Sequence, residues 1–439
     1  MKLLILSLTS ITILLTFLFI FKEILRNKNK NAILIVAPLS LDEYHEENLH
    51  GTHNYKLINC RFASKTKLND CINTCIEQIK HTPIVGIYSS RDYLGNLVSC
   101  LVAHKLGLPG PNPQTVLSYH HKYYSRLIQQ QHVPEACPNF QLIDPKNIKS
   151  ENIKLSFPLF IKPVKSYFSI LAQKIDSFEQ LQALGTKLMP SKEFLEPLND
   201  ALKLYSNYTL SANYLLAEEL LSGQQVTIEG YIYNGEPYIF GVTDSIMYPG
   251  TISFERFEYP SSLPIEVQDR MADIAIRLMQ STKFDNSFFN IEYFYNSKDD
   301  TIKIIEVNPR LASQFADLYE RVDGINSYRA LMDLAAGKKP KTSKRKGQFK
   351  YAASCVLRVF EDKFVTKIPN LAHQCHVQAL LPDVHIRIFA QEGKRLSDIE
   401  QDGKSFMYSI ISLGGDSSED IKRRLSLCKE LLPFKFSLP

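Results

Sequence analysis

The sequence predicts an α/β and α+β protein of several packed units, and three observations carry that prediction. With 439 residues, the chain is too long for one ordinary hydrophobic core. From Ala32 onward, short apolar runs alternate with segments of helical periodicity, as they do around a parallel sheet. Between residues 157 and 308 several β-rich segments follow one another, and the last two read as a hairpin.

The first unit reads as strand, helix, strand and helix. The expected strands are residues 32–38 and 83–88, and the expected helices are residues 67–80 and 94–106. This succession predicts a right-handed parallel unit, a Rossmann-like N-terminal domain. The chain contains neither G-x-G-x-x-G after its first strand nor G-x-x-x-x-G-K-[ST], so neither common phosphate loop explains its chemistry.

The middle of the chain reads as α+β. A helix is expected over residues 113–131, and a strand over residues 351–360 opens a small, mixed C-terminal domain. The strands expected between them are residues 157–162, 170–174, 214–218, 225–233, 237–243, 289–295 and 301–308.

The most informative segment is the hairpin at residues 289–310. If Asp299 is the centre of its turn, Glu292 lies directly opposite Glu306, and Asn308 shares the face of Glu306. Opposed carboxylates lie about 5 Å apart and repel each other unless a cation lies between them. Two carboxylates and an amide oxygen suit Mg²⁺ shared with phosphates, and Arg310 could hold a phosphate or a carboxylate. The alternative is an ordinary solvated hairpin face.

The N-terminus predicts a transmembrane helix. Residues 3–21 form 19 positions without a charge, which is long enough to cross a bilayer. Lys22, Arg26, Lys28 and Lys30 follow against the single acid Glu23, which predicts that the body of the protein lies in the cytoplasm. The alternative, a cleaved signal peptide, lacks an A-x-A site.

The net charge of +5 is a local property of residues 338–350, which hold seven basic residues and no acid. A nucleic-acid-binding protein would spread basic charge over a docking face, so we expect no nucleic-acid partner. The cluster of His373, Cys375 and His376 could bind zinc, but no second ligand pair lies at a matching spacing. We interpret these three as ordinary loop residues.

Several of these segments resemble the ATP-grasp superfamily. Glu306-Val-Asn308-Pro-Arg310, preceded by Glu292, resembles its metal-binding signature. His120-His-Lys122-Tyr-Tyr-Ser-Arg126 and Phe157-Pro-Leu-Phe-Ile-Lys162 resemble the segments whose lysines reach the nucleotide phosphates. Ala217-Glu218-Glu219-Leu220-Leu221-Ser-Gly223 looks like the hinge that clamps adenine.

The resemblance implies a role for each matching residue. Glu218 and the backbone of Glu219 and Leu221 would contact the base, and Gln225 stands where a ribose-binding Glu is common. Ser169 matches a hydroxyl position of the phosphate-covering turn, although this turn lacks the usual glycines. Glu292, Glu306 and Asn308 would bind two Mg²⁺ ions, with Mn²⁺ as an alternative, while Arg310 and Lys162 would act on the reacting groups.

Together with the patterns described above, the resemblance predicts a division of the chain into an anchor and basic flank (1–30), a Rossmann-like domain (31–115), an ATP-grasp domain (116–337), a basic linker (338–350) and a C-terminal α+β domain (351–439). Residues 150–225 would form the lid subdomain of the ATP-grasp core.

The implied function is an ADP-forming ligase that activates a carboxylate as an acyl phosphate for attack by an amine or a thiol. Its partners would be these small molecules, ATP and the membrane, and a homodimer is compatible with the resemblance. Two alternatives stay open, namely biotin-carboxylase-like activation of bicarbonate and a non-catalytic, membrane-tethered ATP-binding module.

Overall fold

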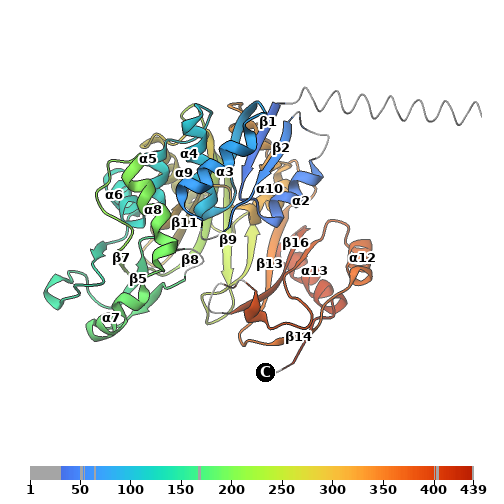
Figure 1. Ribbon diagram of the computed structural model, residues 1–439. Helices are drawn as coiled ribbons and strands as arrows, with labels where there is room; N and C mark the ends of the chain where they lie inside the picture. Colours follow the sequence, from blue (N-terminus) through green and yellow to red (C-terminus); the bar gives the residue numbers. More distant parts are fainter. Residues whose placement is uncertain are drawn as a thin grey trace, which may run out of the picture.

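The N-terminal unit is a three-stranded parallel sheet with strand order β2-β1-β3 (Figure 1). The computed structural model describes residues 31–49, 53, 55–63, 66–166, 170–399, 401 and 405–437. The elements of the unit are β1 (Asn31–Val36), α2 (Ser40–Asn48), β2 (Tyr55–Cys60), α3 (Leu68–Ile79), β3 (Ile84–Tyr88) and α4 (Leu97–Lys105). The predicted parallel opening is confirmed. The elements α2 and β2 escaped prediction because neither has a continuous apolar run.

The helix expected over residues 113–131 is wrong as a single element, because the chain breaks at His121. The two helices are α5 (Pro113–His120) and α6 (Lys122–His132), and His121 between them has an extended backbone (φ −103°, ψ 96°). The backbone N–H of Lys122 donates to the carbonyl of Val164 at 2.9 Å instead of continuing α5. The break therefore ties the start of α6 to the chain that follows β5 (Leu159–Pro163).

A four-stranded antiparallel sheet with order β4-β7-β5-β6 forms the next layer. Its apolar face packs against α7 and the chain around it, through buried residues such as Ile161, Ile175, Leu181 and Leu215. The strand expected at residues 170–174 lies instead at β6, and β4 was not expected. The elements are β4 (Phe140–Ile143), β5, β6 (Gln173–Ile175), α7 (Phe178–Leu184), α8 (Lys192–Tyr205) and β7 (Leu215–Glu219).

An eight-stranded antiparallel sheet with order β12-β11-β8-β9-β10-β13-β16-β15 runs through the rest of the molecule. Its strands are β8 (Gln224–Tyr233), β9 (Glu236–Met247), β10 (Phe254–Tyr259), β11 (Ser287–Asn296), β12 (Thr301–Asn308), β13 (Tyr351–Val359), β15 (His385–Ile388) and β16 (Phe406–Gly415). The other elements are α9 (Ile265–Gln280), α10 (Ala316–Asp323), α11 (Ser327–Ala335), α12 (Leu371–Leu380), α13 (Ser418–Leu431) and the paired strands β14 (Phe364–Lys367) and β17 (Lys435–Ser437).

The basic segment at residues 338–350 lies against α10. The backbone N–H groups of Gly347 and Phe349 donate to Val322 and Arg321 at 3.0 Å each, and Lys344 pairs with Asp323 at 3.0 Å. After this segment, β13 pairs with β10 in the same sheet. The domain limits stay predictions.

The N-terminal unit and the large sheet share one core. Residues of β1, α3 and α4 belong to the same buried cluster as residues of β8 and β11. In a second cluster, the ring of Phe240 on β9 contacts Tyr231, Phe288 and Tyr319. The expected transmembrane helix falls in residues 1–30, outside the described residues; within the described part of the chain, no helix is long and apolar enough to cross a membrane.

We expect Phe240→Ala to lower the free energy of unfolding by about 3–5 kcal/mol, because the side chain is fully buried and its removal leaves a cavity between β9 and α10. Urea denaturation followed by circular dichroism measures this loss. Leu371→Ala is the control, since Leu371 is 75% exposed and its truncation should change stability by less than about 0.5 kcal/mol. Equal effects of the two substitutions would contradict the shared core.

Candidate active site

The acidic hairpin is formed by β11 and the outermost strand of the large sheet, β12. Glu292 pairs directly with Glu306, as predicted, and Asn308 pairs with Asn290 two positions further. Nearer the turn the predicted pairing is off by one residue, because the register shifts between Glu292 and Tyr293. The shift leaves Ile305 as an extra residue in β12, which is a β-bulge.

The bulge gives the carbonyl of Ile305 two partners from outside the hairpin. Arg126 on α6 donates to this oxygen through Nη2 at 2.7 Å, and Lys162 on β5 lies with Nζ at 3.4 Å from it. Two cationic side chains are therefore held next to the opposed carboxylates.

Lys122 neutralises one of the two opposed glutamates. Its Nζ lies 2.8 Å from Oε1 of Glu306, and the side chain of Lys122 is buried. The interruption between α5 and α6 makes Lys122 the first residue of α6, while its amide is bound to Val164. The helix break thus positions this lysine between the four-stranded sheet and the hairpin.

Glu218 holds the other lysine. Its carboxylate accepts from Arg126 Nε at 2.7 Å and pairs with Lys162 Nζ at 2.8 Å, and all three side chains are buried. One acid and two cations form a network that also reaches the bulge at Ile305. Removing Glu218 would leave two buried cations without this acid, and removing either cation would leave Glu218 with one cationic partner in place of two.

The surroundings separate the pKa values of the two opposed glutamates. Burial, and after it the facing carboxylate of Glu306, raise the pKa of Glu292 to about 7. Burial also acts on Glu306, but the nearby ammonium groups of Lys122 and Lys162 outweigh it and hold the pKa below its ordinary value. Cations therefore stabilise the charged form of Glu306, whereas at Glu292 the charges of Arg310 and Lys162 offset burial only in part.

Glu292 also receives two amide groups. Gln225 donates to its Oε2 at 3.2 Å, and Asn308 donates to its Oε1 at 3.3 Å. Glu292, Glu306 and Asn308 therefore converge, as the hairpin reading expected. Two carboxylates and an amide are hard oxygen donors, so the donor set fits Mg²⁺.

Residues 155–317 match the model of a known family, described as the ATP-grasp domain. The chain contains an ATP-grasp domain. Among curated proteins, none matches this sequence.

Solved structures of ATP-grasp enzymes share the fold along nearly the whole chain. An L-amino acid ligase from Bacillus licheniformis is 17% identical, with a TM-score of 0.70, over 93% of this chain and 99% of the ligase. A phosphoribosylglycinamide synthetase from Anaerococcus prevotii is 14% identical, with a TM-score of 0.63, over 93% and 100%. The biotin carboxylase domain of 2-oxoglutarate carboxylase from Hydrogenobacter thermophilus is 12% identical, with a TM-score of 0.66, over 92% and 91%.

The expected adenine hinge of the ATP-grasp domain follows β7. The carboxylate of Glu219 accepts from the backbone and side-chain nitrogens of Asn139 at 2.9 Å each, which turns this side chain away from Lys162 and Glu218. Leu221 is half-buried. Gly223 has a φ of +130°, and a Cβ there would lie 2.2 Å from the carbonyl oxygen of Tyr295, so the hinge lies directly on β11. Ser169 lies outside the described residues.

Arg126 is a site residue that the sequence reasoning missed. It stands four positions after Lys122, in the segment that resembles the phosphate-contacting one, and on a helix this spacing places both on one face. The spacing was a usable signal, but it does not show that Arg126 reaches Glu218 on β7.

A second missed group surrounds Asp92, directly after β3. Asp92 lies 3.5 Å from Lys165, 3.7 Å from His120 and 3.9 Å from Arg310. Burial raises the pKa of Asp92, but the charges of Lys165 and Arg310 reverse the shift and hold it well below its ordinary value. In α/β proteins, ligand-binding groups commonly lie beyond the carboxyl ends of parallel strands. The position of Asp92 after β3 was therefore a usable signal.

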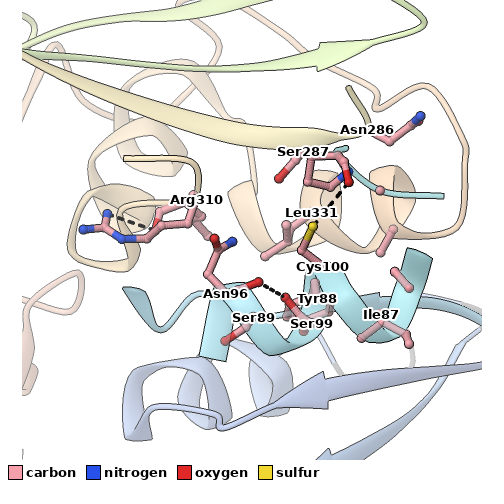
Figure 2. A pocket seen from close by; sticks show the side chains of 15 residues that line it. Ile87, Tyr88, Ser89, Asn96, Ser99, Cys100, Asn286, Ser287, Arg310 and Leu331 are labelled. Atoms are coloured by element: carbon pink, nitrogen blue, oxygen red, sulfur yellow. Dashed lines mark hydrogen bonds between the residues drawn. The ribbon is translucent and has the colours of Figure 1, made fainter. Parts of the chain in front are cut away.

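A cavity of about 20 Å³ lies beside this group, between the N-terminal unit and the loop after β12. Asn96 and Arg310 line it, and Figure 2 shows the guanidinium of Arg310 directed away from the other lining side chains. Asn96 donates to the carbonyl of Pro309 at 3.0 Å, which fixes the backbone next to Arg310. The cavity has room for a single water molecule.

We expect Arg126→Met to lower the free energy of unfolding by about 3 kcal/mol or more, because Glu218 would keep a buried charge with one cation fewer. Urea denaturation at neutral pH measures the loss. Arg277→Met is the control, since Arg277 makes exposed ion pairs with Asp273 and Glu135, worth about 0–1 kcal/mol. A small effect at Arg126 would show that the network is not a structural requirement.

Proposed function

We propose that the chain is an ATP- and Mg²⁺-dependent ligase that activates a carboxylate as an acyl phosphate for attack by an amine or a thiol. The observation that carries this proposal is the convergence of Glu292, Glu306 and Asn308 on one side of the hairpin, with Lys122 and Lys162 against them. Acid ligands for metal and cations for phosphate are the two requirements of phosphoryl transfer.

ATP would bind between the four-stranded sheet and the hairpin. Lys122 and Lys162, which now neutralise Glu306 and Glu218, would exchange part of these contacts for phosphate oxygens. The remaining contacts to the nucleotide would come from Glu218, the backbone of Glu219 and Leu221, the side chain of Gln225 and the hydroxyl of Ser169.

Glu292, Glu306 and Asn308 would hold two Mg²⁺ ions, or Mn²⁺ in their place. When bound, the ions neutralise charge on the triphosphate and on the phosphoryl group in transfer. The pair of glutamates would then no longer depend on Lys122 for neutralisation, which frees its ammonium for the nucleotide.

Activation is needed because oxide is a poor leaving group for attack on a carboxylate. A carboxylate oxygen attacks the γ-phosphorus of ATP, the bond to the bridging oxygen breaks, and ADP leaves. The amine or thiol then attacks the acyl carbon, and inorganic phosphate leaves with the electron pair. Lys162 would stabilise the transferring phosphoryl group, and Arg310, half-buried beside Asp92, would hold the carboxylate in line.

We favour an amino acid as a substrate, either as the carboxylate that is activated or as the amine that attacks the acyl phosphate. The likeness of the fold to an L-amino acid ligase, over nearly the whole chain, supports this choice. Bicarbonate is the competing substrate, since a biotin carboxylase domain shares the fold over a similar length. Release of ADP and phosphate, measured against a panel of amino acids, other carboxylates and bicarbonate, separates the two.

We also propose that residues 1–30 anchor the protein in a membrane, with the ligase body on the cytoplasmic side. The support is the uncharged run at residues 3–21 and the basic flank that follows it.

We expect Glu306→Gln to reduce ATP-dependent phosphate release by about 100-fold or more, because the metal site would lose one of its two negative charges. A coupled ADP assay with the responding substrate measures it. Glu236→Gln is the matched control, since Glu236 is exposed at the start of β9. Retained turnover in Glu306→Gln would reject the metal role, and tight Mg·ATP binding without hydrolysis by the unsubstituted chain would favour the non-catalytic module.

The anchor predicts that the full chain sediments with membranes and resists extraction by carbonate at high pH, because a spanning helix is held by burial of apolar side chains. A chain lacking residues 1–30 should stay in the supernatant. Membrane association that survives this deletion would assign it to another part of the protein.

A further inference from the structure

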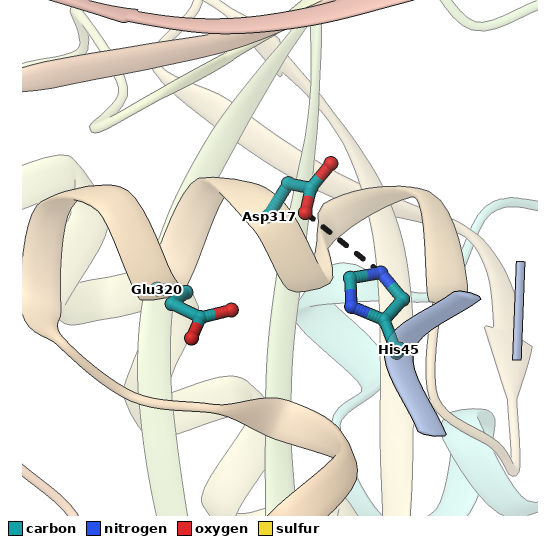
Figure 3. Close-up of side chains that lie close together, drawn as sticks. All are labelled: His45, Asp317 and Glu320. Atoms are coloured by element: carbon teal, nitrogen blue, oxygen red, sulfur yellow. Dashed lines mark ion pairs between the residues drawn. The ribbon is translucent and has the colours of Figure 1, made fainter. Parts of the chain in front are cut away.

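A second cluster of titratable side chains lies where α2 meets α10, on residues that have no role in the proposed ligase site. His45 projects from α2, and Asp317 and Glu320 project from α10 toward it (Figure 3). One ligand atom from each of the three lies within 4.8 Å of the other two.

The imidazole of His45 points a buried nitrogen into this cluster. The residue is 3% exposed, and in the described part of the chain its Nε2 has no hydrogen-bond partner. The facing atom is Oδ1 of Asp317 at 3.8 Å, which is too long for a hydrogen bond. Buried polar atoms are normally satisfied, so an atom held in this way calls for a ligand between it and the carboxylate.

A divalent transition-metal ion fits that gap. Zinc lies about 2.0–2.2 Å from nitrogen and oxygen ligands, so neighbouring ligand atoms in a tetrahedral site lie about 3.3 Å apart. The separation of His45 and Asp317 exceeds this by about half an ångström, which a small side-chain rotation closes. One imidazole and two carboxylates leave a fourth position for water.

The two rings and the central carboxylate are held in place by their neighbours. His45 stacks on Tyr328, with ring centroids 4.5 Å apart. His385 on β15 reaches the other oxygen of Asp317 through Nδ1 at 3.4 Å, and stacking on Tyr44 at 3.7 Å fixes its ring. In metal sites, a ligating carboxylate is typically hydrogen-bonded through its other oxygen by a neighbouring side chain, which fixes its orientation. His385 is placed to do this for Asp317.

The charges around the cluster are balanced. Arg321 lies 3.3 Å from Oδ1 of Asp317 and is also bound to the carbonyl of Asp383 at 2.6 Å, so it can remain beside an ion without moving into its place. Burial lowers the pKa of Arg387, which faces Asp317 as well. The carboxylates of Asp317 and Glu320 offset these two guanidinium groups, and the imidazole of His45 brings a lone pair without charge.

We propose that His45, Asp317 and Glu320 form a second metal site, which binds one divalent transition-metal ion such as Zn²⁺ and fastens α2 to α10. The ion ties the N-terminal unit to the helix that follows Arg310 and the hairpin. This role is structural and independent of the proposed ligase reaction.

The test uses the full chain with Glu306→Gln, which removes one of the two carboxylates of the hairpin site and so weakens metal binding there. After removal of metal with a chelator, Zn²⁺ is titrated in the presence of excess Mg²⁺ and without nucleotide, and its binding is followed by calorimetry. We expect one equivalent of Zn²⁺, with affinity lowered at least 100-fold by His45→Ala and about 10-fold by Glu320→Gln. His376→Ala on α12 is the matched control and should bind as tightly as the parent.

Thermal unfolding gives the second readout. Zn²⁺ should raise the melting temperature of the parent and of His376→Ala, and should raise it less in Glu320→Gln. Glu320 is exposed, so this variant keeps the test valid should His45→Ala fail to fold. Absence of Zn²⁺ binding by the parent, or equal affinity in Glu320→Gln and the parent, would overturn the site.

Discussion

Two carboxylates facing each other across a hairpin require positive charge nearby, and two neighbouring elements, α6 and β5, supply it. Glu292 and Glu306 are opposed in register, and repulsion between them destabilises the pairing in the absence of positive charge. Lys122 arrives from α6 and Lys162 from β5, while Arg126 holds the bulged backbone beside Glu306. The segments that supply these cations are far from the hairpin in the sequence, so only the fold brings them to it.

Local departures from regular structure place the charged groups. The break at His121 starts a new helix at Lys122, and the bulge at Ile305 frees a carbonyl for Arg126 and Lys162. A continuous helix from residue 113 would have kept the Lys122 amide inside the helix, away from Val164. In an unbulged strand Ile305 would pair with Tyr293 of β11, whereas the bulge leaves Ile305 without a partner in the ladder. In both places a backbone group is bound by another element: the Lys122 amide by the chain after β5, and the Ile305 carbonyl by side chains of α6 and β5.

Features that depend on residues close together in the sequence were predictable. Features that depend on contacts between residues distant in the sequence were not. The parallel opening, most strands of the middle region and the pairing of Glu292 with Glu306 follow from apolar periodicity and turn residues. The helix break depends on Val164, which is distant in sequence from His121, so no local pattern reports it. The same limit applies to Asp92 beside Arg310, and to His45 beside Asp317, which only the fold brings together. The expectation that His373, Cys375 and His376 lie on a loop is wrong, because all three are on the helix α12, where Cys375 is exposed.

The pairing of β10 with β13 has a consequence for how the protein can be shortened. The C-terminal strands complete the same sheet that carries the acidic hairpin, and Arg256 to Tyr259 hydrogen-bond along Ala352 to Cys355. A fragment ending after α11 would turn β10 into an edge strand with a row of unsatisfied backbone groups. Such an edge invites pairing with another molecule, so proteolytic clipping near residue 340 would yield a self-associating product rather than a free-standing catalytic core.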